Sequence, residues 1–204
     1  MNPTPRPAIN PVPRDIGAWR HDQRATLIEA RLAVPIAERV AVGEEIAAEL
    51  TARVNAGPNT TISLYWPFRG EIDLRPLMLS MHERGCRIAL PVVVAKARPL
   101  VFREWSPGCA MDKGVWNIPI PADGPEIEPS VTIAPLVGYD PSCYRLGYGG
   151  GFFDRTLAAA RRKPLVIGVG LPSAALPTIH PQPHDIPMDL IVTGKGRVIE
   201  RVES

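Results

Sequence analysis

The sequence RLGYGGGFFDR, residues 145–155, places three consecutive glycines directly before two phenylalanines. It follows an apolar run over residues 131–137 and leads into a helical pattern over residues 153–162. In α/β folds, backbone N–H groups at such a helix N-terminus can bind an anion, and glycine lets the backbone approach it closely. The stretch therefore indicates an α/β fold and a candidate phosphate-binding loop. The alternative is a tight strand-to-helix turn whose phenylalanines fill the core.

The apolar periodicity of the remaining chain extends this pattern in both directions. Helices are predicted over residues 17–33 and 36–54, with Pro35 between them, and later over 75–84 and 153–162. Strands are predicted over residues 61–66, 87–94, 131–137, 165–171 and 190–193, and an alternating run over 100–105 is a candidate partner of 87–94. Residues 106–130, rich in Pro and Gly, are predicted to be a long loop. We expect an α/β fold with a three-layer αβα open sheet, largely parallel and Rossmann-like, with an N-terminal helical pair.

Length and charge limit the domain organisation and the class of partner. A chain of 204 residues suits one domain, which we place at residues 16–204 after a proline-rich, disordered tail at residues 1–15. Because 23 basic residues are balanced by 21 acidic ones, the net charge of +2 favours neither a nucleic acid nor an acidic membrane surface. No apolar stretch approaches the roughly 18 residues that a membrane helix needs.

Three cysteines, Cys86, Cys109 and Cys143, are widely spaced and form no CxxC pair. An odd number with this spacing argues against both a disulfide framework and a zinc site. Free thiols fit a reducing compartment, so we expect a cytoplasmic location.

The charged residues around the glycines suggest how the loop could bind phosphate. Arg145 and Arg155 could donate charge-assisted hydrogen bonds to phosphoryl oxygens. Asp154 offers a hard oxygen ligand suited to Mg²⁺. The spacing matches neither GxxxxGK[ST] nor the dinucleotide pattern GxGxxG, so the motif alone does not identify the ligand.

Two further stretches could contact an organic substrate. Residues 67–73, PFRGEID, follow a predicted strand, where Glu71 and Asp73 could orient a polar ligand or act as capping acids. Trp116 lies in the predicted long loop, where its indole could stack on a flat ring or simply pack.

Two more stretches could contact phosphate or metal. Arg20 and Arg24 lie four residues apart on the predicted first helix and share a face, which could meet a polyphosphate or remain solvated. Residues 184–189, HDIPMD, could supply a metal ligand, and Asp189 could equally cap a turn before the next strand.

Taken in chain order, these stretches resemble the 5-formyltetrahydrofolate cyclo-ligase family, also called methenyltetrahydrofolate synthetases. The strongest resemblance runs from Gly138 through the glycine loop to Arg155, and it is similar to the family signature of an Asp, a short loop, RLGxGxG, two aromatics and Asp. The basic first helix and the segments GEID, WNIP and HD…D follow in the family's order. The resemblance covers about residues 17–197, nearly the whole chain.

The resemblance implies ATP- and Mg²⁺-dependent closure of 5-formyltetrahydrofolate to 5,10-methenyltetrahydrofolate, with release of ADP and phosphate. The formyl oxygen would attack the γ-phosphoryl group, and N10 would displace phosphate from the activated N5-iminium carbon. The implied partners are ATP and a reduced folate, with no nucleic acid and no membrane, and the chain is expected to be a monomer or a weak homodimer.

The resemblance also implies roles for individual residues. Arg145 would be catalytic, and Asp154 and Asp189 would bind Mg²⁺. Substrate would contact Glu71, Trp116, Phe152 and Phe153. ATP would contact Arg20, Arg24, Arg145, Leu146, Gly147, Tyr148, Gly149, Gly150, Gly151 and Phe152.

The chain departs from the family pattern at several positions. Arg20 stands where a lysine is usual, and Phe152 and Phe153 stand where tyrosines are common. Leu74 replaces a frequent threonine, and Gly194 a frequent glutamate. These departures leave two alternatives open, a paralogue that keeps the ATP site but acts on another small molecule, and a non-catalytic folate-binding protein.

Overall fold

The structure is a computed structural model that describes residues 12–202. Residues 1–11, which make up most of the predicted tail, lie outside the described residues. Within 12–202, no helix combines the length and the apolar character needed to cross a membrane.

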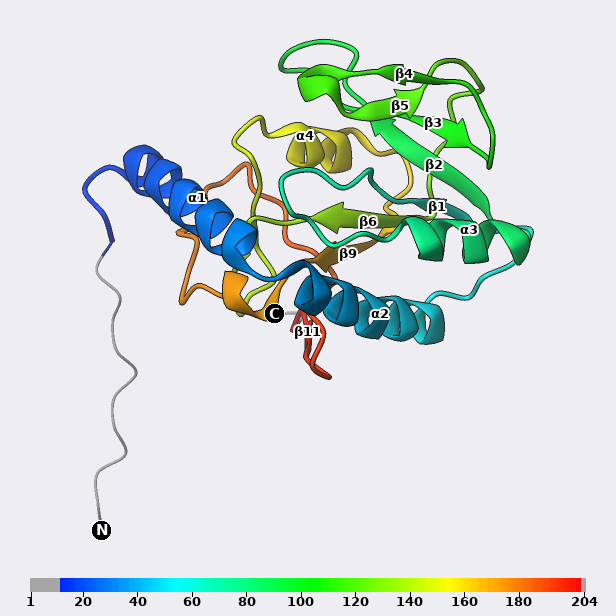
Figure 1. Ribbon diagram of the computed structural model, residues 1–204. Helices are drawn as coiled ribbons and strands as arrows, with labels where there is room; N and C mark the ends of the chain where they lie inside the picture. The colour runs from blue at the N-terminus through cyan, green and yellow to red at the C-terminus, as the bar shows by residue number, and fades with distance from the viewer. Residues whose placement is uncertain (1–11, 203–204) are drawn as a thin grey trace.

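A seven-stranded sheet in the order β11-β10-β9-β6-β1-β2-β3 forms the centre of the fold (Figure 1). Its strands are β1 (Thr61–Ser63), β2 (Arg87–Val92), β3 (Val101–Trp105), β6 (Val131–Pro135), β9 (Leu165–Val169), β10 (Leu190–Val192) and β11 (Val198–Glu200). The inner strands pair in parallel, whereas β3 and β11 run antiparallel at the two edges. The expectation of a largely parallel open sheet is therefore confirmed, as is the pairing of residues 100–105 with the strand before them.

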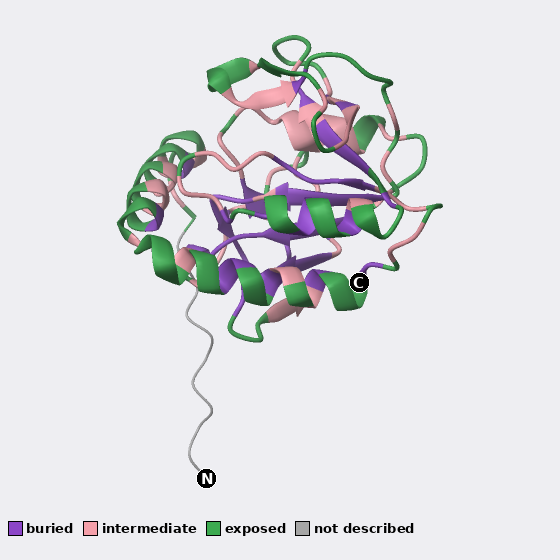
Figure 2. Cartoon of the chain, turned by 45° about the vertical axis from the view of Figure 1, so that its right-hand side comes forward, coloured by how far each residue is buried: buried purple, intermediate pink, exposed green. Residues whose placement is uncertain are grey.

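Helices cover both faces of the sheet because successive strand residues point to opposite sides. On one face, α2 (Ile36–Arg53) and α3 (Arg75–Glu83) bury Ile46, Leu50 and Met78 against alternate strand residues. On the other face, α4 (Phe152–Ala159) packs Phe153 and Leu157 against a second buried cluster. Figure 2 shows the buried strands between helices whose outer faces are exposed. The three-layer αβα prediction is thus confirmed.

The N-terminal helical pair is also confirmed. Helix α1 (Ile16–Ala33) begins after Asp15, whose carboxylate accepts a hydrogen bond from the N–H of Ala18. Pro35 precedes α2 as its N-cap, where its missing N–H removes no helical hydrogen bond. Helix α1 lies beyond the carboxyl ends of the parallel strands (Figure 1), so its arginines can reach the loops at that edge.

The prediction of an unstructured loop over residues 106–130 is wrong in part. This segment contains an antiparallel hairpin of β4 (Met111–Lys113) and β5 (Pro119–Pro121), joined through the 3-10 turn η1 (Val115–Asn117). The short pair β7 (Gly138–Tyr139) and β8 (Arg145–Leu146), the turn η2 (Pro172–Ala174) and β11 were also not predicted. Elements of two or three residues are too short to show a hydrophobic period.

The strands predicted from the sequence end one to three residues later than the observed parallel strands. Residues such as Leu64, Leu136 and Leu171 are buried, so they prolong the apolar pattern after the chain has left the ladder. Helix α4 likewise ends at Ala159 rather than 162, before a run of three basic residues. The segments that follow β1, β2 and β6 line the pocket described next.

Candidate active site

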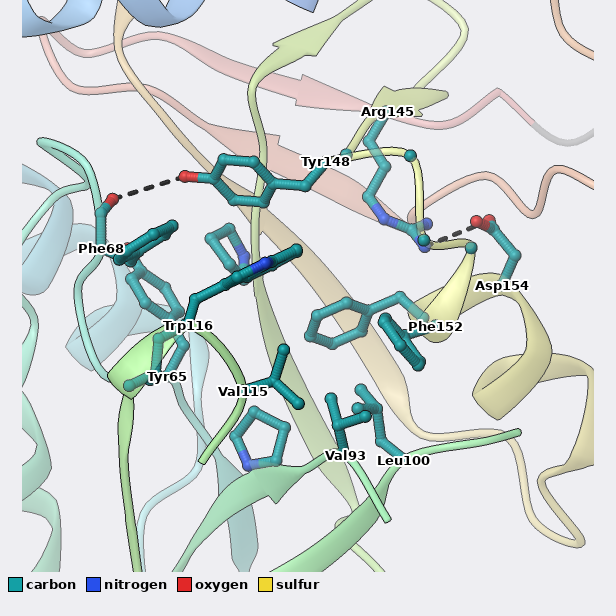
Figure 3. A pocket seen from close by; sticks show the side chains of 18 of the residues that line it. Tyr65, Phe68, Val93, Leu100, Val115, Trp116, Arg145, Tyr148, Phe152 and Asp154 are labelled. Atoms are coloured by element: carbon teal, nitrogen blue, oxygen red, sulfur yellow. Dashed lines mark hydrogen bonds and ion pairs between the residues drawn. The ribbon is translucent and has the colours of Figure 1, made fainter. Parts of the chain in front are cut away.

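A pocket of about 220 Å³ opens at the carboxyl edge of the sheet, beside β1 and β6 (Figure 3). Helix α3 carries the chain from β1 to β2 on one side, whereas β6 lies on the other side of β1, so the strand order reverses there. In open α/β sheets, ligands bind in the crevice at such a switch point. Six segments form the walls: α1, the loop after β1, the end of β2 with the loop that follows it, the β4–β5 hairpin, the loop after β6 that leads into α4, and the loop at 184–185.

The structure brings nearly all of the predicted site residues to this pocket. Its lining includes Arg20, Arg24, Glu71, Trp116, every residue from Arg145 to Phe153, and Asp154. It also includes Tyr65, Phe68, His184 and Asp185, which the sequence analysis did not assign. Asp189 is the one predicted site residue that does not line it.

The glycine loop presents a row of backbone donors. Gly149 and Gly151 have φ values of 92° and 61°, and Gly151 caps α4 without a side-chain hydrogen bond. The N–H groups of residues 149–154 donate to no acceptor within the described part of the chain. A Cβ on Gly150 would lie 2.7 Å from the Phe152 ring, so a larger residue would displace that ring or the loop. N–H groups without a protein acceptor at a helix N-terminus suit a phosphate group.

Arg24 holds this loop from α1. Its Nε donates to the carbonyl of Gly147 at 2.7 Å, and its guanidinium lies beside Gly149. Burial, followed by the nearby charge of Arg20, lowers the pKa of Arg24. Its terminal nitrogens donate to no protein acceptor among residues 12–202, so they can face an anion in the pocket.

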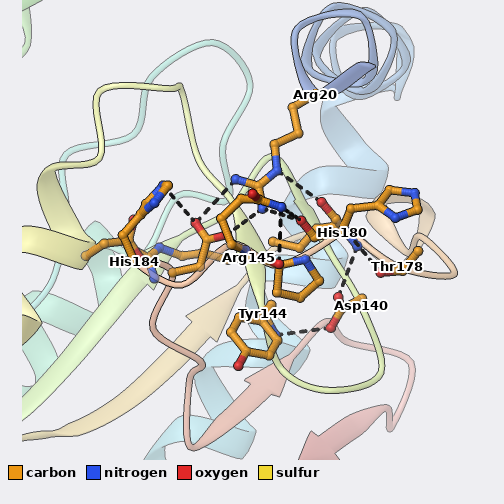
Figure 4. A network of polar contacts seen from close by, with 12 residues as sticks. Arg20, Asp140, Tyr144, Arg145, Thr178, His180 and His184 are labelled. Carbon is orange, nitrogen blue, oxygen red and sulfur yellow. Dashed lines mark hydrogen bonds and ion pairs between the residues drawn. The ribbon is translucent and has the colours of Figure 1, made fainter. Parts of the chain in front are cut away.

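Arg20, by contrast, is committed to the protein itself (Figure 4). Its guanidinium donates to the carbonyls of Ile179 and His180, both at 3.0 Å, and to Asp185 Oδ2 at 2.5 Å. Arg20 and Asp185 are both nearly inaccessible as side chains, at 10% and 9% exposure. Arg20 therefore forms part of the wall, and its contact with a ligand would require it to give up one of these partners. The sequence signal that could have identified Asp185 is the His-Asp pair at 184–185. We assigned the candidate role in that segment to Asp189 instead.

Arg145 and Asp154 form an ion pair at the start of α4. Arg145 Nη2 lies 3.1 Å from Asp154 Oδ1, and the guanidinium stacks over the Phe153 ring at 5.4 Å. Asp154 Oδ1 also accepts the N–H of Ile186. Burial lowers the pKa of Arg145, and Asp154 acts in the opposite direction. Asp154 Oδ2 makes no hydrogen bond to the described residues, which leaves one carboxylate oxygen for a cation or a ligand.

Asp189 lies at the opposite edge of the sheet, before β10. Its Oδ2 accepts the N–H of Val166 at 2.8 Å, and its Oδ1 pairs with Arg201 at 3.2 Å. Because β9 and β10 run parallel, this is the amino edge of the sheet, whereas Asp154 lies at the carboxyl edge. The structure does not bring the two predicted metal ligands together. Within residues 12–202, no three His, Cys, Asp or Glu side chains are grouped to hold a metal ion.

Glu71 lies on the wall formed by the loop after β1. Its Oε2 accepts the N–H of Phe68 at 2.8 Å, and its Oε1 accepts the hydroxyl of Tyr148 at 3.0 Å. Burial raises the pKa of Glu71 to about 7, although Arg31 and both hydrogen bonds act to lower it. Asp73, in contrast, pairs with Arg75 and accepts its backbone N–H at the start of α3. The alternative of a capping acid therefore applies to Asp73, and not to Glu71.

Trp116 lies at the rim of the pocket on the η1 turn. It is 52% exposed, and its φ of 58° is in the left-handed region that bulky residues seldom adopt. Its indole stacks on Phe68 with 5.8 Å between ring centroids and 5° between planes, and Tyr148 lies 5.8 Å away. Figure 3 shows these rings together on one side of the pocket. The exposed aromatic face suits a flat heterocycle.

The departures from the family pattern have local explanations. Gly194 has a φ of 74°, and a Cβ there would lie 2.9 Å from Val42, so a glutamate does not fit this backbone. Leu74 is buried in the core above α3. Phe152 lies under the Arg155 guanidinium and Phe153 under that of Arg145, so both rings serve as platforms for arginines at the pocket.

Comparisons with known proteins agree with this architecture. Residues 16–194 match the model of the 5-formyltetrahydrofolate cyclo-ligase family. A 5-formyltetrahydrofolate cyclo-ligase of Mycolicibacterium smegmatis is 32% identical over 184 residues, which cover 86% of this chain and 94% of that protein. One of Escherichia coli is 31% identical over 65% of this chain and 77% of its own length. The NMR structure of Aquifex aeolicus 5,10-methenyltetrahydrofolate synthetase has a TM-score of 0.78 and 27% identity, and covers 91% of this chain and 94% of its own. The resemblance inferred from the sequence is confirmed.

Proposed function

The chain belongs to the 5-formyltetrahydrofolate cyclo-ligase family, and we propose that it uses ATP and Mg²⁺ to convert 5-formyltetrahydrofolate to 5,10-methenyltetrahydrofolate, releasing ADP and phosphate. One observation carries the proposal. A single pocket combines a row of unpaired N–H groups beside arginines with a buried carboxylate beside exposed aromatic rings. The first half suits a polyphosphate, and the second suits a pterin.

The glycine-loop half fits ATP. The N–H groups of residues 149–154 and the terminal nitrogens of Arg24 would bind phosphate oxygens. Asp154 Oδ2 would hold Mg²⁺ together with phosphate oxygens, since this ion often uses only one or two protein carboxylates. We leave Asp189 out of this site because its oxygens bind Val166 and Arg201 at the other edge of the sheet.

The other half fits the folate. Glu71 offers a carboxylate to the N–H donors of a pterin, and the Trp116 and Phe68 rings offer flat surfaces. Phe152 and Phe153 also line the pocket, and they would contact the substrate near the reacting atoms. The substrate would thus place its formyl group next to the glycine loop.

An amide oxygen is a weak nucleophile and a poor leaving group, and ATP supplies the phosphoryl group that activates it. The chain's own residues would align the reactants and neutralise charge. Arg145, fixed by Asp154, by the Ile186 carbonyl and by the Phe153 ring, would stabilise the negative charge that develops between the formyl oxygen and the phosphoryl group. This chemistry needs no nucleophilic cysteine or general-base histidine.

A turnover assay tests the proposal. The full chain is incubated with 5-formyltetrahydrofolate, ATP and Mg²⁺, and the near-ultraviolet absorbance of the methenyl product is followed, with ADP measured in parallel. Methenyl product that requires both ATP and Mg²⁺ supports the proposal. ATP hydrolysis only with a different acceptor indicates the paralogue, and folate binding without any ATP requirement indicates a non-catalytic binding protein.

The cellular compartment and the oligomeric state that we propose are those expected from the sequence. Cys86 and Cys143 are buried free thiols, and Cys109 is a half-buried one. Because free thiols persist in reducing surroundings, we propose a cytoplasmic location. A monomer or weak homodimer remains a prediction.

Replacing Trp116 by alanine should raise the KM for the folate about 3- to 10-fold and leave the KM for ATP unchanged, because one stacking interaction is worth about 0.5–1.5 kcal/mol. The fold should not suffer, because the indole is half exposed. Val115→Ala, on the same turn, is the matched control for removing apolar surface. Equal KM values for the two variants would contradict the stacking role.

A further inference from the structure

The side chain of Tyr148 points away from the glycine loop that carries it. Its hydroxyl accepts a hydrogen bond from Arg31 Nη2 at 2.5 Å and lies 3.0 Å from Glu71 Oε1. The Phe68 carbonyl lies 3.4 Å from the same hydroxyl (Figure 3). A guanidinium can only donate hydrogen bonds, and a carboxylate accepts them. The phenol therefore accepts the hydrogen bond from Arg31 and donates its own hydrogen to Glu71. We propose that Tyr148 is a positioning residue, which holds Glu71 in place for the folate and connects the glycine loop to the folate wall.

Arg31 provides the fixed end of this chain of contacts. It is only 7% exposed, and its Nε and Nη1 donate to the carbonyls of Arg69, after β1, and Leu136, after β6. These two bonds fix the guanidinium between the loops that follow β1 and β6. Arg31 therefore has little freedom to move toward Glu71, and Tyr148 spans the distance between them.

The surroundings of Glu71 make this contact electrostatically important. The charged and titratable groups that act on it are Arg31 of α1 and Tyr148, and it acts in turn on Tyr65 of the same loop. Asp73 follows two residues later in the chain, and Arg39 of α2 lies beside the neighbouring Gly70. Asp73 is neutralised by Arg75, and the Tyr65 hydroxyl donates to the Ile72 carbonyl. Tyr148 is thus the one side chain among the described residues that donates a hydrogen bond to Glu71. Without the Tyr148 hydroxyl, the Glu71 carboxylate would still accept the hydrogen bond from the Phe68 N–H and would still be attracted by the charge of Arg31.

A simpler role for Tyr148 would be packing, because its ring lies 5.9 Å from Phe68 and 5.8 Å from Trp116. Tyr148→Phe separates the two roles, since it keeps the ring and removes only the hydroxyl. A packing role predicts a variant that behaves as the parent protein. A positioning role predicts a change in Glu71 itself.

The first measurement uses the ligand-free full chain labelled with ¹³C at the glutamate side-chain carboxyl carbons. Glu71→Gln assigns the Glu71 signal, and a pH titration by NMR then follows it in the parent and in Tyr148→Phe. The parent should titrate near pH 7, and the variant at a higher pH, because the donated hydrogen bond that favours the carboxylate is lost. An unchanged or lower pKa in Tyr148→Phe overturns the proposal.

The second measurement rests on the proposed function. At pH 7, Tyr148→Phe should raise the KM for the folate on the order of 3- to 10-fold, because less of Glu71 is ionised, with kcat and the KM for ATP little changed. The KM effect should shrink as the pH rises. An effect on the KM for ATP alone would overturn the proposal. If the parent shows no cyclo-ligase turnover while the NMR titration shifts, the contact stands and the proposed function falls.

Discussion

Replacing Arg145 by alanine is expected to lower kcat on the order of 10²-fold or more, as is typical when one preorganised donor to a transition-state charge is removed. The side chain is almost completely buried at the pocket, paired with Asp154 and stacked on Phe153. A buried guanidinium interacts strongly with developing negative charge because little water screens it. The change should therefore fall mainly on kcat, measured by formation of the methenyl product.

Two variants control this experiment. Arg145→Lys keeps the charge but loses the planar fork, so it should recover only part of the rate. Arg161→Ala removes an exposed arginine just after α4, whose side chain is 87% accessible, and it should keep the parent rate. Circular dichroism and thermal unfolding show whether Arg145→Ala is folded, since the change leaves Asp154 without its partner. A folded Arg145→Ala protein with normal kcat would remove Arg145 from the mechanism.

Replacing Glu71 by glutamine should raise the KM for the folate about 10- to 100-fold above pH 7, because a hydrogen bond to a charged group is worth about 1.5–3 kcal/mol. The KM for ATP should stay the same, since Glu71 lies on the loop after β1 and meets the glycine loop only through the Tyr148 side chain. In the parent protein, the KM for the folate should rise as the pH falls through about 7, where Glu71 takes up a proton. Glu71→Gln should show no such dependence.

Stability gives an independent check on Glu71. Its pKa is raised in the folded protein, from 4.5 to about 7, so the folded state favours the protonated acid. The contribution of this group to the free energy of unfolding is therefore largest below about pH 4.5 and is lost as the pH rises through 7. Relative to the parent, Glu71→Gln should gain stability between pH 5 and pH 8 in urea unfolding. A difference that does not vary with pH would show that Glu71 has an ordinary pKa.

The sequence predicted the parts of this structure that have a period or a motif. Long apolar repeats located α1, α2 and the parallel strands, and the glycine stretch located the start of α4. The hairpin at 111–121 was missed because its strands have three residues each. Strand ends were placed too late because buried residues such as Leu64 continue the apolar pattern toward the pocket.

The residues of the candidate site could be predicted from the sequence only where the interacting groups lie close together along the chain. The glycine loop carries its donors within a few consecutive positions, so its place in the pocket could be anticipated. The partners of Arg20 and Tyr148 could not, because Asp185 and Glu71 are 165 and 77 residues away in the sequence. The partners of Asp189 could not be anticipated either, because Val166 is 23 residues away in the sequence and joins it only through the pairing of β9 with β10.

The same separation has a consequence for biosynthesis. Arg20, Arg24 and Arg31 leave the ribosome on the first helix, long before the residues that they fasten: Asp185, Gly147 and Tyr148. Strands β1, β2, β3 and β6 are made before Gly147 and Tyr148, and β9 is made before the loop at 179–185 that binds Arg20. The pocket therefore cannot be completed until residue 185 has been made, and a nascent chain that stalls before it has five of the seven strands but lacks the Asp185 partner of Arg20.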